Sequence, residues 1–141
     1  MDDDDLMPSD RAFVTLRWFE EHPESELVNY PYMRIGYFGE NLRPFWGEPF
    51  DHERWKKDGT IGYFSNPSCA YKKKSAEEMG GYPSETKNET DDHQFVNNWL
   101  KAGKKIDFDI RAFTNLHRVM PKSMMANLRG WKADWATRKE I

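Results

Sequence analysis

Cysteine is almost absent from this chain, and long apolar runs are missing altogether. The single cysteine, Cys69, has no internal disulfide partner, and no Cys and His residues have the spacing of a zinc site. No apolar stretch approaches the roughly 20 residues that a membrane-spanning helix needs. We therefore expect a fold that depends on an ordinary hydrophobic core, without a disulfide, structural zinc or a membrane span.

A surplus of positive charge is missing as well. Lys and Arg total 21 residues against 24 Asp and Glu, which gives a formal net charge of −3. Proteins that bind nucleic-acid backbones generally need an excess of Lys and Arg, so this balance argues against such a partner. The first residues, Met1–Asp5, are acidic where a secretory signal peptide is basic. We expect a cytoplasmic protein.

Aromatic residues, in contrast, are plentiful: they make up 15% of the chain and include six Trp. This content favours a folded protein over an intrinsically disordered one. The length of 141 residues suits one domain that buries a single core. We interpret residues 1–141 as a single domain.

Hydrophobic periodicity and turn residues predict helices and strands in alternation. Helices are expected from Ser9 or Asp10 to His22, from a Ser75 cap to Gly80, from a Thr90 cap to Gly103, and over 124–135. Strands are expected over 26–38, 61–71 and 106–110, with a long aromatic loop over 39–60. Pro31 makes the first strand either an edge strand or two pieces. This interleaving indicates the α/β class.

Two details of this pattern concern the core. In the first helix, the spacing of Ala12, Phe13, Leu16 and Phe19 predicts the apolar face, which Val14 and Trp18 widen. In the last strand, Ile106, Phe108 and Ile110 alternate with polar residues, so these three are expected to point to one side of a sheet.

Two acidic clusters are candidates for chemistry. The run Asp2–Asp5 is either a solvated tail or a set of oxygen ligands for Mg²⁺ or Mn²⁺ at the end of a strand. Asp91 and Asp92 occupy the first turn of the Thr90-capped helix. They either complement the helix dipole or supply a general base.

Other residues permit a structural and a functional interpretation. Lys72–Lys74 either end a strand in solvent or bind a phosphate, and we favour the solvated strand end. His117 and Arg118 follow a predicted strand, a place suited to a metal ligand or a diphosphate contact. Trp46, in the long loop, is the best candidate for stacking on a sugar ring.

Taken in order, these segments resemble the family 2 glycosyltransferases, which have the GT-A fold. The acidic run and the proline at 2–8 are similar to the family's DxD segment, and residues 68–82 to its stretch ending in Gly-Gly and an aromatic residue. Residues 90–95 resemble its Glu-Asp helix, and 117–123 its Tyr-Arg-x-His tail. The resemblance covers almost the whole chain.

The resemblance implies a set of roles. Asp2 and Asp4 would bind the nucleotide-sugar donor and a divalent metal, Mn²⁺ or Mg²⁺. The family's metal-binding histidine falls on Met120, and His117, three residues earlier, is the candidate to replace it as a metal ligand. Arg118 would contact the donor, Asp92 would be the catalytic base, and Asp91 would stand beside it. The implied reaction is inverting transfer of a sugar to a carbohydrate or other hydroxyl acceptor.

The chain departs from the family pattern in two ways. Met120 stands where the family often has a histidine, and the DxD segment comes at the very start of the chain. We therefore expect a partial GT-A fold, a mixed sheet flanked by helices, without the N-terminal nucleotide-binding strands. Such a chain would form an oligomer or pair with a complementing chain. The alternative is a non-catalytic remnant that binds a carbohydrate or a partner through residues 39–60.

Overall fold

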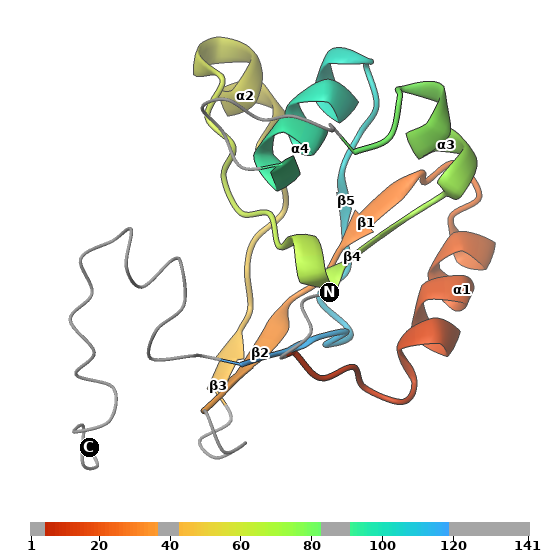
Figure 1. The fold of residues 1–141 in the computed structure, drawn as a ribbon, viewed down its shortest axis with the longest axis vertical. Coiled ribbons are helices and arrows are strands. Elements are labelled where there is room, and N and C mark those ends of the chain that lie inside the picture. Colours follow the sequence, from red (N-terminus) through yellow and green to blue (C-terminus); the bar gives the residue numbers. More distant parts are fainter. Residues whose placement is uncertain (1–4, 37–42, 83–90, 119–141) are drawn as a thin grey trace.

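A computed structural model describes residues 5–36, 43–82 and 91–118. These residues form an α/β arrangement of short helices around two small mixed sheets (Figure 1). The helices are α1 (Arg11–Glu21), α2 (His52–Asp58), α3 (Lys73–Glu78) and α4 (Asp91–Lys101), with a 3-10 turn at Asn66–Ser68. The strands are β1 (Leu27–Asn29), β2 (Tyr32–Ile35), β3 (Arg43–Phe45), β4 (Cys69–Tyr71), β5 (Asp107–Phe108) and β6 (Leu116–Arg118).

Each sheet is built around one half of an interrupted strand. β1 lies between antiparallel β4 and parallel β5, and β2 lies between antiparallel β3 and parallel β6. The two halves are separated at Tyr30 and Pro31, because proline cannot donate a backbone hydrogen bond to a neighbouring strand. The predicted strand over 26–38 is therefore two pieces, as one of the two interpretations had it, and each piece is central rather than at an edge.

Hydrogen bonds hold the turn at Tyr30 and Pro31, where the chain passes from β1 to β2. Tyr30 is fully buried, and its carbonyl oxygen accepts hydrogen bonds from the Tyr63 hydroxyl at 2.8 Å and the Ser68 hydroxyl at 3.0 Å. Pro31 is also fully buried. The segment just before β4, residues 63–68, therefore holds the turn from one sheet into the other.

Alternation along β1 places a core on each face of the first sheet. Leu27 packs with Phe95, Val96 and Trp99 of α4, and α2 and α3 complete that side. Val28 faces the other way and packs with Trp18 of α1. The sheet is therefore covered on one face by α2, α3 and α4 and on the other by α1 (Figure 1). The helix predicted to end at Gly103 is α4, and its apolar residues Phe95, Val96, Trp99 and Leu100 are all buried.

The predicted apolar face of α1 is right for Val14, Trp18 and Phe19 but wrong for Phe13 and Leu16. Phe13 and Leu16 are 66% and 65% exposed, whereas Trp18 is the buried residue of this helix. The Trp18 indole also donates to the Ser25 hydroxyl, 3.1 Å away, which anchors that face of the helix to the start of β1. The helix therefore lies on the sheet through the side that carries Val14, Trp18 and Phe19.

Residues 39–60 are not one long loop, because they contain β3 and α2. The Asp51 side chain caps α2 by accepting from the Arg54 amide at 2.9 Å, and Gly59 ends the helix with a left-handed φ of 74°. These are ordinary start and stop signals. The strand expected over 61–71 is also shorter, since only Cys69–Tyr71 pair with β1.

Two further expectations are corrected. Ser75 is not the cap of its helix, because α3 begins at Lys73 and the buried Ser75 hydroxyl donates to Glu26 at 2.7 Å. The expected strand over 106–110 is only Asp107–Phe108, with Ile110 55% exposed and Asp109 buried. The chain turns out of the sheet there because Asp109 accepts the Arg111 amide and binds its guanidinium.

Two predictions, the Thr90 cap and the helix over 124–135, lie outside the described residues. Among the residues that are described, none of the helices combines the length and the apolar character that a membrane crossing requires.

Gly47 is needed where it stands. Its φ is +65°, and an added Cβ would lie 2.8 Å from Cδ1 of Tyr63 and closer still to two other ring carbons. The hydroxyl of Tyr63 is held by Tyr30, so the ring cannot easily move aside. We expect Gly47→Ala to cost about 2–3 kcal/mol of unfolding free energy, from backbone strain plus overpacking.

The measurement is the melting temperature or a denaturant titration. Gly59→Ala is the matched control, because its φ is +74° but nothing lies within 4 Å of the new methyl group. It should show only the backbone cost, about 1–2 kcal/mol. Equal losses for the two variants would mean that the Tyr63 contact is not important.

Candidate functional site

Asp5 is the described member of the acidic run, and it is buried. Its carboxylate accepts three hydrogen bonds: from the Asn115 side-chain amide at 2.9 Å, from His117 Nδ1 at 3.1 Å and from the Arg118 backbone amide at 2.9 Å. The neighbouring Leu6 forms a backbone bridge with Leu116 of β6. The acidic run therefore meets the strand of His117, although the two are 112 residues apart in sequence.

These hydrogen bonds determine the charge of Asp5. Burial alone would raise the pKa of the carboxyl group, but the hydrogen bonds from His117, Asn115 and the Arg118 amide outweigh it. The pKa of Asp5 is consequently below its ordinary value, and the group is ionised at neutral pH. The sequence pattern placed Asp5 within the acidic run but gave no sign of Asn115, a buried polar residue with no motif around it.

His117 and Arg118, both predicted site residues, lie next to Asp5. His117 also contacts Tyr32 ring edge to face, with centroids 5.7 Å apart. The Arg118 guanidinium donates to the Gly36 carbonyl at 3.4 Å. Asp2 and Asp4 lie outside the described residues, so the structure describes only His117 of the three predicted metal ligands. Within the described part, no three Asp, Glu, His or Cys side chains form a group able to hold a metal.

Asp91 and Asp92 begin α4, as predicted. Asp91 accepts the Asp92 amide at 3.0 Å, and Asp92 accepts the His93 amide at 2.9 Å, so both stabilise the positive end of the helix. Asp91 is exposed, whereas Asp92 is half-buried. Burial raises the pKa of the Cys69 thiol to about 12, and the charge of Asp92 adds to this effect, which places Asp92 in electrostatic range of β4.

The first turn of α4, which carries Asp91 and Asp92, and its last turn lie near different ends of β1 (Figure 1). The far end of the helix leads to Lys104, whose ammonium group binds Glu26, just before β1, at 2.6 Å. The first turn therefore points to the opposite end of β1, where the chain continues into the second sheet (Figure 1). Thr114 links the two regions, because its hydroxyl donates to the Ser68 carbonyl beside Cys69 while Asn115 binds Asp5.

Residues around this end of the first sheet are aromatic. Tyr82 stacks on Phe95 of α4, with ring centroids 4.3 Å apart, and its hydroxyl bonds to Asn66. Trp46 follows β3 and is 53% exposed, with its ring 4.9 Å from that of Phe113. Trp46 therefore presents part of its indole to solvent, as stacking on a sugar would require.

Lys72–Lys74 follow the end of β4 and begin α3. Lys72 Nζ donates to the Pro23 carbonyl at 2.6 Å, and Lys73 pairs with Glu77 at 3.5 Å. Lys73 and Lys74 are exposed. These contacts agree with the interpretation of Lys72–Lys74 as a solvated strand end.

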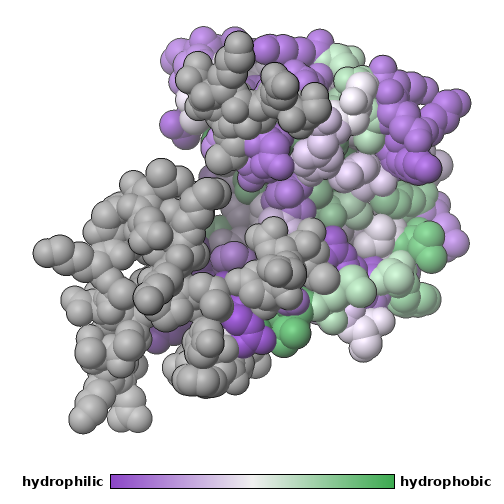
Figure 2. Space-filling view, in the orientation of Figure 1, coloured by the Kyte–Doolittle hydropathy of each residue, from purple (hydrophilic) through white to green (hydrophobic). Residues whose placement is uncertain are grey.

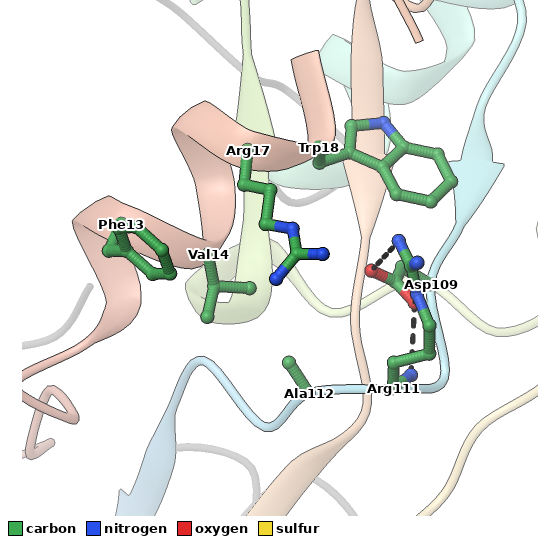
Figure 3. A pocket seen from close by; sticks show the side chains of 7 residues that line it. All are labelled: Phe13, Val14, Arg17, Trp18, Asp109, Arg111 and Ala112. Atoms are coloured by element: carbon green, nitrogen blue, oxygen red, sulfur yellow. Dashed lines mark hydrogen bonds and ion pairs between the residues drawn. The ribbon is translucent and has the colours of Figure 1, made fainter. Parts of the chain in front are cut away.

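A separate shallow pocket, of about 280 Å³, lies between α1 and the turn after β5 (Figure 3). Its cations are already paired: Arg111 with Asp109 at 2.8 Å and Glu21 at 3.3 Å, and Arg17 with Glu21 at 2.7 Å. Of the predicted catalytic and metal-binding residues that the structure describes, none lines it.

No protein-family model matches the chain, and no curated protein matches it either. A functional proposal therefore has to stand on the residues and contacts above.

Proposed function

We propose that this chain is the catalytic part of a glycosyltransferase of the family 2 type, with a partial GT-A fold. It would transfer a sugar from a nucleotide-sugar donor to the hydroxyl of a carbohydrate or similar acceptor, with inversion. The observation that carries the proposal is the contact of Asp5 with His117 and Arg118. It joins the acidic run to the tail motif, the two segments to which the resemblance gives the donor and the metal.

The residues present suit a divalent cation. In metal sites, a carboxylate commonly accepts one ring N–H of a ligating histidine and so fixes which nitrogen is presented to the metal. Asp5 accepts the Nδ1 hydrogen of His117 in this way. Asp2, Asp4 and His117 would hold Mn²⁺ or Mg²⁺, which would stabilise the charge of the departing diphosphate.

The other residues would bind and orient the two substrates. Arg118 would contact the donor's diphosphate, and Trp46 would stack on a sugar ring. Asp92 would accept the proton of the attacking hydroxyl as general base, with Asp91 beside it. Its position on the first turn of α4, towards the end of β1, supports this role. In sheets of this kind ligands bind beyond the carboxyl ends of parallel strands, and β1 and β5 are parallel.

Calorimetry with uridine diphosphate, with and without Mn²⁺, tests the proposal. We expect binding that requires the metal, and a loss of about ten- to a hundredfold in metal-dependent affinity for Asp5→Asn, which alters the partner of His117. Asp4→Ala should abolish the metal dependence. His22→Asn, at the end of α1, is the control and should bind as the wild type does. Equal heats for the wild type and Asp4→Ala would remove the metal site from the proposal.

A partner-binding role is the second candidate, and one observation favours it. Phe13 and Leu16 are each about two-thirds exposed on the outer side of α1, beside the pocket. Green patches lie among paler and purple ones over α1, whereas the surface over α3 is mostly purple (Figure 2). Exposed apolar patches commonly mark association sites. Under this alternative the chain would be a non-catalytic module, and under either one we expect an oligomer or a complementing chain.

A further inference from the structure

One face of the second sheet carries two rows of side chains in register. Arg34 of β2 pairs with Arg43 of β3 on one side and with His117 of β6 on the other. Tyr32 pairs with Phe45 in the neighbouring row. Because paired residues point to the same side of a sheet, these five side chains share one face. We call it the arginine–aromatic face, together with Tyr63, which packs on it.

The two arginines of this face lie opposite each other in register. Like charges directly opposite on antiparallel strands repel, so such a pair is unfavourable unless something anionic compensates it. Among residues 5–36, 43–82 and 91–118, no carboxylate forms an ion pair with Arg34 or Arg43. Within this part of the chain the arrangement therefore concentrates positive charge locally, although the net charge of the protein is −3.

Arg34 is held in position before any ligand arrives. Its guanidinium lies 4.7 Å from the centre of the Phe45 ring and 5.7 Å from that of Tyr32, and it donates to the Tyr32 hydroxyl at 3.1 Å. A guanidinium has five N–H donors, so this single hydrogen bond leaves most of them for an oxyanion. Holding the group in place in advance lowers the entropy lost on binding. Arg43, on the outer strand, is exposed.

An aromatic stack lies directly beside the arginines. The ring centroids of Tyr32 and Phe45 are 5.0 Å apart and those of Phe45 and Tyr63 are 5.5 Å apart, with the planes within 26° of parallel. All three rings are half-buried. An aromatic ring offers apolar contact area to a sugar ring, and a guanidinium group binds a carboxylate or phosphate through two parallel hydrogen bonds.

We propose that the arginine–aromatic face binds an acidic acceptor, a saccharide that carries a carboxylate, sulfate or phosphate group. The identification of this ligand as the acceptor rests on the proposed glycosyltransferase function. The proposal that the face binds an acidic sugar does not depend on that function. His117, at the Asp5 end of the row, lies two strand spacings from Arg43, about 10 Å. That separation is about one to two sugar rings, so a sugar with its acid group on the arginines would extend towards the Asp5–His117 end.

The test is a binding titration of the full chain with glucuronate and with glucose, followed by NMR chemical shifts. We expect glucuronate to bind at least about tenfold more tightly than glucose, and salt to weaken it. Arg43→Gln should reduce glucuronate affinity about tenfold, and Arg34→Gln with Arg43→Gln should reduce it further. Arg54→Gln, an exposed arginine of α2, is the control and should not change binding.

Arg34 contacts two rings, so its replacement can disturb the sheet. Arg43 is exposed, and Arg43→Gln alone therefore keeps the test valid if the double variant fails to fold. Undiminished glucuronate binding in Arg43→Gln, or glucose binding as tightly as glucuronate, would overturn the proposal.

The anion on the arginines could belong to an acidic acceptor sugar or to the diphosphate of the donor. A titration of Arg43→Gln with uridine diphosphate and Mn²⁺ distinguishes these two. We expect Arg43→Gln to leave the binding of uridine diphosphate unchanged. A parallel loss of uridine diphosphate and glucuronate would instead assign the row to the donor and overturn an acceptor site. If glucuronate binds in an arginine-dependent way but no nucleotide binds with or without metal, the acidic-sugar site stands and the glycosyltransferase proposal fails.

Discussion

Asp92→Asn is expected to lower kcat by about two to four orders of magnitude in a preparation that transfers sugar, alone or with a complementing chain. An amide cannot accept the proton of the attacking hydroxyl. The same amide oxygen can still accept the His93 N–H that Asp92 accepts now, at 2.9 Å, so the start of α4 should remain intact. KM for the donor should hardly change, because donor binding is assigned to other residues. Steady-state kinetics against donor concentration measures both quantities.

Asp91→Asn is the matched control, one residue earlier on the same turn. Consecutive residues on a helix point about 100° apart, so the two carboxylates cannot both face one hydroxyl. Asp91 is exposed and should matter much less. If Asp91→Asn abolishes turnover while Asp92→Asn does not, the base is the other residue. If neither changes turnover in an active preparation, α4 is not catalytic.

The second large effect concerns stability. Asp5→Ala removes the acceptor of three hydrogen bonds and leaves the Asn115 amide, His117 Nδ1 and the Arg118 N–H without this acceptor. Breaking a buried charged network by deleting one member typically costs about 3–5 kcal/mol. We expect a loss of that size in unfolding free energy, measured by denaturant titration with circular dichroism.

Asp5→Asn should cost less, because of a feature of Asn115. The Oδ1 atom of Asn115 has no hydrogen-bond partner among the described residues. A flip of the Asn115 side-chain amide would present that oxygen to the NH₂ group introduced at position 5. The side-chain oxygen retained at position 5 would continue to accept from the Arg118 amide. Equal losses for Asp5→Ala and Asp5→Asn would contradict this account of the network.

The wild-type chain should also lose stability in acid. An unfolded aspartate has a pKa of about 3.9, and the pKa of Asp5 in the folded chain is lower than this value. Its contribution is therefore complete above about pH 4 and disappears as the pH falls through the folded value. This acid-dependent part should be absent from Asp5→Asn, and unfolding titrations of both chains between about pH 6 and pH 3 would show it.

Sequence patterns predicted the elements that have strong local signals. α4 could be predicted because its apolar residues recur at helical spacing, and Phe95, Val96, Trp99 and Leu100 are all buried. The break of the strand at Pro31 followed from the chemistry of proline alone. The predicted face of α1 was too wide, because Phe13 and Leu16 also have helical spacing, but the sheet contacts only the side with Trp18. Periodicity finds a helix and does not say which of two possible stripes faces the core.

In the candidate site, too, residues with local sequence signals could be predicted and residues brought together by folding could not. The sequence suggested His117, Arg118 and Asp92 because each stands near a strand end or a helix start, which are local features. It did not suggest Asn115, whose role depends on a residue 110 positions away. Nor did it suggest Arg34 and Arg43, because their proximity follows from the register of two strands. Contacts of this kind arise only when the chain is folded.

The turn at Tyr30 and Pro31 has a mechanical consequence. Asp92 belongs to the layer on the first sheet and Asp5 binds the edge strand of the second, so this turn is one of the links between the proposed base and the proposed donor site. Rotation about it would change their separation, but proline fixes one backbone torsion and two hydroxyl groups bind the carbonyl just before it. These contacts restrain the turn at one backbone torsion and at one carbonyl group. Under the proposed function, a restrained turn would favour a fixed separation between the proposed base and the proposed donor site.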